Sequence, residues 1–294
     1  MHRMMSDKRT IFLMMAPGFA VFFAIVFIPV FVSLFYSFTD WDGISAYRMV
    51  GLHNYRELLL HDPVFWKALR NAFLLGGAFL LIQHPLAVAT AMILQYCGRA
   101  EKALRTILFI PSIISGFVTS KMWVQILSTQ FGLLNRLLDA VGLSTWRQDW
   151  LGSSSWAIAS IIFVAMWQGF GYAFLLYYTG VKGIPQDLHE AARLDGATAW
   201  QLNTRIVLPL LQPVIRTSII LAFIAAFKQM DTVYLMTQGG PDNSTQFLAT
   251  YLYQKAFSIN LYGYANAISV LFIIVCLLVT AALNRMGRQE VGEF

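Results

Sequence analysis

Residues 183–209 read GIPQDLHEAARLDGATAWQLNTRIVLP and form a polar stretch between two long apolar segments. The pattern predicts a helix, a turn and a second helix. Pro185 suits the first turn of the first helix, where its missing N–H costs nothing. Asp195-Gly196 is a stop signal, because glycine readily adopts the left-handed conformation that ends helices. Thr198 can then cap the second helix.

One face of the first predicted helix carries small and apolar residues. Leu188, Ala191 and Ala192 share it through their i, i+3, i+4 spacing. Small alanines allow another protein surface to approach the helix closely, and Glu190 beside them offers an anion to a basic partner. We interpret residues 181–209 as a docking element, and an ordinary amphipathic connector is the alternative that these residues leave open.

The chain around this loop is unusually apolar. Of its 294 residues, 57% are hydrophobic and 12% are charged, whereas a soluble domain carries about 25% charged residues. Lipid can accommodate such an excess, and about 20 mainly apolar residues cross a bilayer as a helix. Six segments meet that length, so we predict an all-α polytopic membrane protein, a single domain over residues 1–294, with transmembrane helices at 11–38, 71–96, 107–127, 156–180, 210–227 and 264–284.

The distribution of basic residues predicts the orientation. If both termini are cytoplasmic, the inner connections hold 11 Lys and Arg in 58 residues and the outer connections hold 7 in 94. Cytoplasmic loops carry such an excess of cations. The net charge of +6 follows from the same rule, and the basic residues are scattered, so nucleic acid is not a predicted partner.

Polar residues within the apolar segments indicate a solute pathway, because burying them in lipid is costly. Hydrogen bonding between helices is the alternative explanation. Lys228 and Asp231 are three residues apart and could pair on one helix face. We interpret Pro17, Pro29 and Pro85 as structural kinks. The polar set comprises Gln83, Gln125, Gln168, Lys228, Gln229, Asp231 and Asn266.

The loop resembles a known family. Every defined position of the EAA loop of bacterial ABC importer permeases is matched here. The matching pattern is Glu190-Ala191-Ala192, three residues, Gly196, nine residues, Ile206, one residue and Leu208-Pro209. The resemblance implies the type I permease fold, with residues 181–209 forming a cytoplasmic coupling loop that sits in a groove on an ATPase subunit. It also implies that Glu190 faces a basic ATPase residue and that Gly196 makes the sharp turn.

A second stretch is similar to the carbohydrate branch of that family. FKQMDTVYLMTQGGPDNST at 227–245, YLYQKAF at 251–257 and FGLLN at 131–135 resemble the first permease subunit of the maltose and glycerol-3-phosphate systems. Large additional segments of the maltose subunit are missing, and the shorter pattern is similar to the glycerol-3-phosphate type. The expected substrate is therefore a sugar or sugar-like solute.

The resemblance also implies partners and a location. The expected assembly contains a second homologous permease subunit, two ATPase subunits that bind ATP and Mg²⁺, and an extracytoplasmic solute-binding protein, in the inner membrane of a bacterium. This chain has no GxxxxGK[ST] phosphate loop and is therefore not expected to be an enzyme or to hold a cofactor. His189 and Arg193 occupy the ligand positions of an HExxH-like pattern, and arginine cannot bind zinc, so no metal site is predicted.

Two other functions were weighed. An ion-coupled secondary transporter requires an internal repeat and ionisable residues at mid-membrane, and no repeat is visible. An intramembrane enzyme would need a catalytic motif, and none is found. We place the sugar beside Lys228, Gln229 and Asp231, because sugars are bound by amides and charged groups that satisfy several hydroxyls. The resemblance implies sugar contacts from this same helix, with amides where Lys228 and Gln229 stand, and the lysine favours an acidic or phosphorylated substrate.

Overall fold

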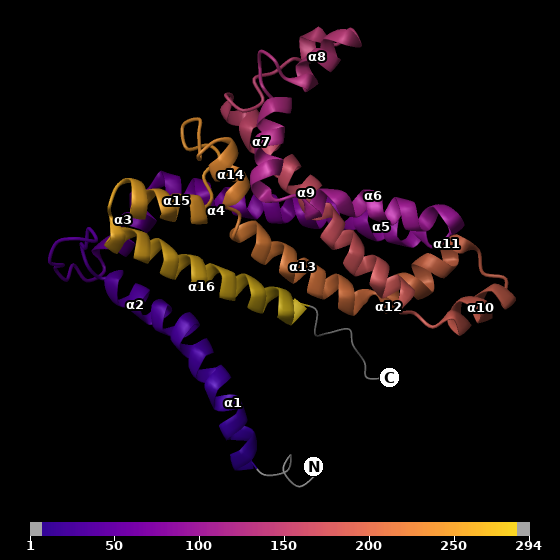
Figure 1. Ribbon diagram of the computed structural model, residues 1–294, viewed down its shortest axis with the longest axis horizontal. Helices are drawn as coiled ribbons and strands as arrows, with labels where there is room; N and C mark the ends of the chain where they lie inside the picture. The colour runs from indigo at the N-terminus through magenta and orange to yellow at the C-terminus, as the bar shows by residue number, and fades with distance from the viewer. Residues whose placement is uncertain (1–7, 287–294) are drawn as a thin grey trace. The chain divides into compact units, whose positions relative to one another are not determined.

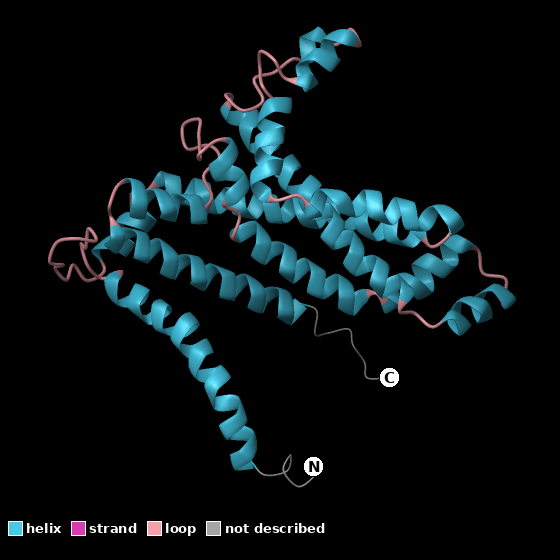
Figure 2. Cartoon of the chain, viewed as in Figure 1, coloured by secondary structure: helices cyan, strands magenta, loops and turns pink. Residues whose placement is uncertain are grey.

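The chain folds almost entirely into helices (Figures 1 and 2). The computed structural model describes residues 8–286, and within that range the only β-type pairing is an isolated bridge between Thr39 and Met49. The contacts divide the chain into two units: one combines residues up to 62 with residues 252–274, and the other combines residues 63–251 with the C-terminal part from 275. Each is described by itself.

The first unit begins with an apolar helical segment: α1 (Lys8–Phe22), the π-helical turn η1 (Phe23–Phe27) and α2 (Ile28–Tyr36). It also contains α3 (His53–Leu60), η6 (Gln254–Ser258) and the first part of α16 (Tyr262–Met286). No side chain of residues 11–36 is buried, and most of them are apolar, which suits a helix surrounded by lipid.

The second unit is a bundle around two long helical segments. One is α4 (Pro63–Ala78), η2 (Phe79–Gln83) and α5 (His84–Leu94), and the other is α9 (Ser154–Lys182). Small residues of α5, Ala87 and Ala91, pack against Phe174 and Tyr177 of α9. Small side chains such as these let helices approach closely.

Within the described residues, the unit contains twelve further elements. They are η3 (Gly98–Ala100), α6 (Glu101–Ile113), α7 (Gly116–Ile126), α8 (Leu133–Ala140), η4 (Ser144–Trp146), α10 (Gln186–Leu194), α11 (Ala199–Leu202), η5 (Asn203–Val207), α12 (Leu208–Leu210), α13 (Gln212–Phe227), α14 (Asp231–Met236) and α15 (Leu248–Tyr253), the last of which ends at the boundary with the first unit.

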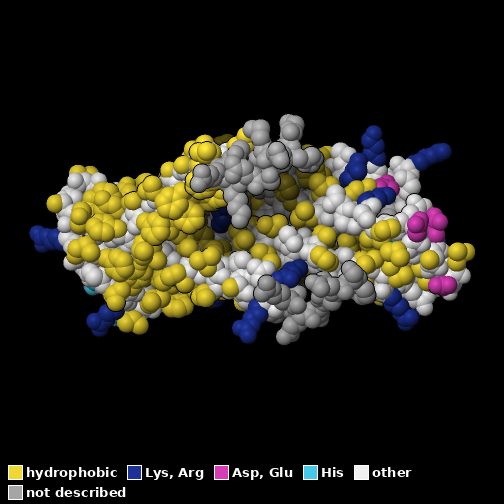
Figure 3. Space-filling model, turned by 90° about the horizontal axis from the view of Figure 1, so that it is seen from below, with side chains coloured by type: hydrophobic (Ala, Val, Ile, Leu, Met, Phe, Trp, Pro, Cys, Tyr) yellow, Lys and Arg dark blue, Asp and Glu magenta, His cyan; other side chains and the backbone are white. Residues whose placement is uncertain are grey.

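The predicted membrane helices are largely confirmed. Within the described residues, five helical segments are long and apolar enough to cross a membrane: Ile11–Tyr36, Pro63–Leu94, Ser154–Lys182, Gln212–Met236 and Tyr262–Arg285. The second begins eight residues before the predicted start at residue 71, because Pro63 initiates a helix that continues directly into the apolar run. Hydrophobic side chains cover much of the face shown in Figure 3, as expected for lipid contact.

The predicted third membrane helix, 107–127, is not one straight helix. It belongs to a pair, Gly98–Ile113 and Gly116–Ile126, bent by 93° at the break between them. Ile114 and Ser115 have extended backbones, and the Ser115 side chain caps α7 by accepting a hydrogen bond from the Val118 N–H. A serine that caps α7 compensates for hydrogen bonds lost where α6 ends. The chain can therefore turn at residues 114–115, although its hydropathy is continuous there.

Two of the three expected proline kinks share a pattern: Pro29 and Pro85 each lie two residues after a π-helical turn, η1 and η2. Pro17 lies inside α1 without such a turn. Pro209, which was not an expected kink, follows η5 in the same way. Proline lacks an N–H and its ring collides with the carbonyl four residues earlier. A wider π-helical turn just before the proline lets the helix continue despite this collision.

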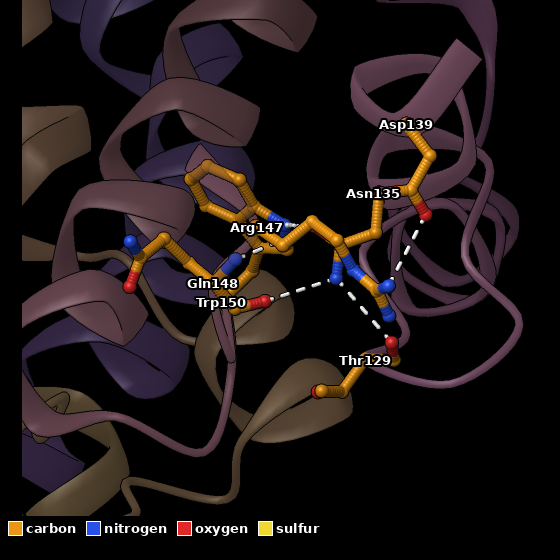
Figure 4. A network of polar contacts seen from close by, with 6 residues as sticks. All are labelled: Thr129, Asn135, Asp139, Arg147, Gln148 and Trp150. Atoms are coloured by element: carbon orange, nitrogen blue, oxygen red, sulfur yellow. Dashed lines mark hydrogen bonds and ion pairs between the residues drawn. The ribbon is translucent and has the colours of Figure 1, made fainter. Parts of the chain in front are cut away.

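The connection between α7 and α9 is held by a polar network (Figure 4). The buried Asn135 of α8 donates from Nδ2 to the carbonyls of Thr129 (3.3 Å) and Gln148 (3.0 Å), and its Oδ1 accepts the indole N–H of Trp150 (2.8 Å). An ion pair of 3.2 Å joins Arg147 to Asp139. Asn135 thus ties α8 to the chain on both sides of it.

A carboxylate closes the same connection. The Thr129 hydroxyl and the Gly152 N–H donate to one oxygen of Asp149 at 2.8 and 2.9 Å. These hydrogen bonds, that of Thr129 first, hold the pKa of Asp149 below its ordinary value. The interaction favours the ionised form because both donors point at the charge.

We expect Asn135→Ala to loosen residues 127–153, because it leaves the Trp150 N–H and two carbonyls without partners. Each such loss costs about 1–3 kcal/mol in a buried setting. Limited proteolysis of the purified protein should show faster cleavage in this segment. Arg136→Ala changes an exposed neighbour on the same helix and is the control; equal cleavage of the two variants would contradict the role of Asn135.

Candidate functional sites

The loop of residues 181–209 has the predicted helix–turn–helix form. α10 ends at Leu194, and Gly196 takes a positive φ of +77°. The Ala197 N–H then bonds to the Ala192 carbonyl (2.9 Å) and the Gly196 N–H to the Arg193 carbonyl (3.0 Å). This is the paired arrangement of a glycine-ended helix, and any other residue at position 196 would be strained there.

The start of each helix is also defined. Pro185 lies just before the first turn of α10 rather than within it: its ψ of 135° is extended, so the helix begins one residue later than predicted. Thr198 caps α11 as predicted, and Gln201 completes a capping box by accepting from the Thr198 N–H at 2.8 Å. These caps make the loop a stiff element rather than a flexible connector.

The predicted docking face of α10 is divided in the structure. Ala192 is buried and belongs to the protein's own core together with Leu202, Val207 and Leu211. Leu188 and Ala191 are exposed. The single face of three residues was therefore wrong, because Ala192 packs into the buried cluster while Leu188 and Ala191 stay exposed. The exposed side available to a partner carries Leu188, Glu190 and Ala191.

Charged groups concentrate around α10. Glu190 is exposed and accepts a hydrogen bond from Gln186 Nε2 at 3.2 Å. Beside it lies a hollow of about 550 Å³ lined by Pro185, His189 and Arg193 among others. Figure 3 shows acidic and basic side chains gathered at the end of the molecule where α10 lies. The loop thus presents fixed charges beside exposed apolar side chains, namely Leu188, Leu194 and Trp200.

The loop is anchored to the bundle by further polar contacts. Lys182, at the end of α9, forms an ion pair of 2.8 Å with Glu101 at the start of α6, and the Tyr178 hydroxyl donates to the same carboxylate. Gln95 Nε2 donates to Asn203 Oδ1 at 3.1 Å. These contacts join the loop to α6, to α9 and to the residue that follows α5.

A second candidate site lies where two interrupted helices meet. The break between α6 and α7 contacts α9 and the break between α13 and α14, since α7 packs against α14. A cavity of about 330 Å³, called cavity A here, lies between them. Its polar and small lining residues are Ser112, Gly116, Gln168, Gly169, Tyr172, Lys228, Gln229, Asp231 and Thr232.

Gln168 joins α9 to the end of α6 by two hydrogen bonds. Its side-chain Nε2 donates to the Ile114 carbonyl at 3.0 Å. Its backbone carbonyl accepts a hydrogen bond from the Ser112 hydroxyl at 2.6 Å. The side chain thus satisfies a carbonyl that the break leaves without a helical partner. Gly171 permits this contact, because a Cβ there would lie 2.5 Å from Ser112 Oγ and 3.0 Å from the Phe109 Cα.

Lys228, Gln229 and Asp231 all line cavity A, as their proposed role in substrate binding requires. They do not lie on one continuous helix, because α13 ends at Phe227 and α14 begins at Asp231. The expected pair of Lys228 with Asp231 is wrong: the structure shows no ion pair between these two described residues. The i, i+3 argument fails because it assumes helical backbone between them.

The other polar residues of the predicted set are distributed differently. Gln125 is exposed on α7 and is not part of the cavity lining. Asn266 donates to the Tyr262 carbonyl at 2.8 Å, a bond within its own helix. Gln83 is buried near Gly169. Within the described residues there is no group of three or more His, Cys, Asp or Glu suited to a metal ion.

Sequence reasoning missed Ser112, Gly116 and Tyr172. A signal was present for the first two: Pro-Ser at 111–112 and Ser-Gly at 115–116 are typical of a helix boundary. Tyr172 carried no such signal, because one more aromatic residue in an apolar helix is indistinguishable from core.

Comparison with known proteins identifies the family. Residues 83–289 match the family described as binding-protein-dependent transport system inner membrane component. The chain belongs to this family. The prediction of an importer permease, made from the loop that ends at Pro209, is confirmed.

Relatives of this permease give the same result. A probable ABC transporter permease of Bacillus subtilis, YurN, is 35% identical over 87% of this chain and 90% of its own length. The diacetylchitobiose uptake system permease NgcF of Streptomyces coelicolor is 32% identical over 97% of this chain and 84% of its own length. None of the relatives or structures supports the ion-coupled transporter.

The fold of the permease is that of a solved transporter. A permease chain in the crystal structure of a bacterial alginate ABC transporter superposes with a TM-score of 0.83 at 24% identity, covering 96% of both chains. This confirms the predicted all-helical type I permease fold.

Proposed function

We propose that this permease carries a carbohydrate across the membrane through cavity A. The observation that carries the proposal is the meeting of two helix breaks around about 330 Å³ of space lined by amide, hydroxyl and charged groups. Cavities of roughly 300–1,000 Å³ suit small ligands, and a few placed polar groups fix their orientation. Relatives named for diacetylchitobiose and multiple-sugar transport support a carbohydrate.

The permease works as one part of a complex. The proposed assembly contains a second homologous permease, two ATPase subunits and an extracytoplasmic solute-binding protein, as the family description and the alginate transporter with its bound periplasmic protein suggest. ATP and Mg²⁺ belong to the ATPases. Glu190, Ala191, Ala192 and Gly196 form the coupling element, with Glu190 and Ala191 facing the ATPase and Ala192 and Gly196 shaping the loop.

The transport cycle is alternating access. ATP closes the ATPase dimer and moves the coupling loop as a rigid body, and the movement passes to α5, α6 and α9 through the Lys182–Glu101 and Gln95–Asn203 contacts. ATP can shift the permease between two states only if it binds one of them better than the other.

Purification of the complete complex with its binding protein tests the substrate class. We expect a saccharide, neutral, acidic or phosphorylated, to raise the melting temperature of the binding protein and to stimulate ATPase activity of the complex in vesicles. Lys228 favours an acidic or phosphorylated sugar. Stimulation only by amino acids, peptides or metal ions would contradict the proposal.

The proposed orientation, with both termini and the coupling loop in the cytoplasm of a bacterial inner membrane, is tested by labelling. Single cysteines at the exposed positions Ser45 and Ala199, after replacement of Cys97 and Cys276, should differ in intact cells. An impermeant thiol reagent should label only position 45, because position 199 lies in the coupling loop. Labelling of position 199 alone, or of both equally, would contradict this orientation.

A further inference from the structure

A second cavity adjoins cavity A. Cavity B has a volume of about 320 Å³ and shares Phe79, Gly169, Tyr172 and Ala225 with cavity A. It continues along α13 as far as Ser218. Ser218 lies ten positions before Lys228, a separation of about 15 Å along a helix. The two cavities therefore follow α9 and α13 toward the coupling loop.

Four buried polar residues gather at cavity B. Gln83 and His84 lie at the junction of η2 and α5, Tyr177 on α9 and Ser218 on α13, and none is more than 6% exposed. His84 Nδ1 lies 2.5 Å from the Tyr177 hydroxyl, and the Ser218 hydroxyl lies near the same oxygen. All except Tyr177 line the cavity.

Polar atoms of this cluster lack protein partners. Gln83 Oε1 and His84 Nε2 are shielded from solvent and make no hydrogen bond. Such groups are costly inside an apolar span, and most of them find a partner in stable proteins. Two of them at one cavity indicate that another state of the protein supplies a partner.

Gln83 lies beside a residue that lines both cavities. The Gln83 amide lies against Gly169, where an added Cβ would be 3.4 Å from Nε2, and Gly169 lines both cavities. Gln83 also ends the π-helical turn η2, and such turns in helices are frequent at functional sites. A small shift of η2 relative to α9 would turn the amide and the imidazole toward cavity B.

We propose that Gln83, His84 and Ser218 form a second polar site on the transport path, which is closed in this conformation and opens to hydroxyl groups in another state of the cycle. The hydroxyl groups belong to water or to the passing sugar. An amide, an imidazole and a hydroxyl can each both donate and accept, so they suit hydroxyl ligands of either source. The proposal rests on the transport function proposed above.

Cysteine accessibility tests whether the site opens. In the assembled transporter, with Cys97 and Cys276 replaced, Ser218→Cys is treated with aminoethyl methanethiosulfonate, once without nucleotide and once trapped with ATP and vanadate. Ser160→Cys is the matched control, because Ser160 is also 6% exposed or less on a long helix, lines no cavity described here and donates to the Trp150 carbonyl at 2.9 Å.

We expect the Ser218 variant to react about tenfold or more faster than the control in one of the two states, as an opening of the site to water requires. Reaction as slow as the control in both states would overturn the proposal. If Ser218→Cys does not assemble, Ala222→Cys on the same cavity wall replaces it. The measurement needs no sugar, so it remains decisive even if the substrate proves not to be a carbohydrate.

Apolar replacements separate the two sources of hydroxyl groups. The variants Gln83→Leu and His84→Phe remove the unpartnered atoms. A raised KM for the sugar that stabilises the binding protein shows that the sugar itself contacts the site, and a lower kcat at unchanged KM shows that water does. If transport is unchanged and the melting temperature of the variant transporter is unchanged or higher, the cluster is only structural, and the proposal is overturned.

Discussion

Glu190→Lys abolishes uptake while the protein still inserts into the membrane and assembles its helices. The expectation follows from its position: Glu190 is exposed on α10, its hydrogen bond to Gln186 is local, and it takes no part in the core. Removing one charge of a docked pair costs about 2–5 kcal/mol, and reversal adds repulsion from the basic partner. Uptake of radiolabelled sugar and copurification of the ATPase measure the loss.

Asp187→Lys provides the matched control for Glu190. It makes the same charge change on the same short helix, at an exposed position one turn nearer the N-terminus, and should retain most of the uptake. If Glu190→Lys transports like the wild type at equal expression, or if both variants fail equally, then Glu190 has no specific role in coupling.

Gln229→Ala impairs sugar transport without changing assembly or basal ATPase activity. Gln229 lines cavity A at the break between α13 and α14, where no helix hydrogen bonds depend on its side chain. Leaving a sugar hydroxyl without its hydrogen-bond partner in a closed cavity weakens the binding free energy by about 1–3 kcal/mol. The expected loss in kcat/KM for uptake is about 5- to 150-fold, with most of it in KM if the contact exists in the resting complex.

Gln125→Ala is the control for Gln229. It removes the same amide from an exposed position on α7 that does not line the cavity, and its transport kinetics should match those of the wild type. Unaltered kinetics in Gln229→Ala would exclude Gln229 from the site. Lys228→Gln adds information on charge: a selective loss for acidic or phosphorylated sugars identifies Lys228 as their counter-ion.

Much of the coupling loop could be predicted from its residues because its structure is local. The glycine stop at Gly196 and the cap at Thr198 depend on neighbours within four or five residues, which the sequence displays directly. The same holds for most membrane helices, since their length and hydropathy are properties of a continuous segment. The bend at residues 114–115 was missed because a capping serine can begin a helix inside an apolar run without lowering its hydropathy.

For the candidate substrate site, the sequence indicated some of the residues, and the structure showed how they come together. The sequence showed that Gln168, Lys228, Gln229 and Asp231 are polar residues in or beside apolar segments. Because polar residues are costly in lipid, each was a candidate for the solute pathway. Their meeting with Ser112 and Tyr172 in cavity A, and the unpartnered atoms of Gln83 and His84 beside cavity B, depended on how α6, α9 and α13 pack. Residues far apart in the sequence, such as Ser112 and Asp231, came together because interrupted helices expose backbone groups that only distant side chains can satisfy. No local pattern encodes that pairing.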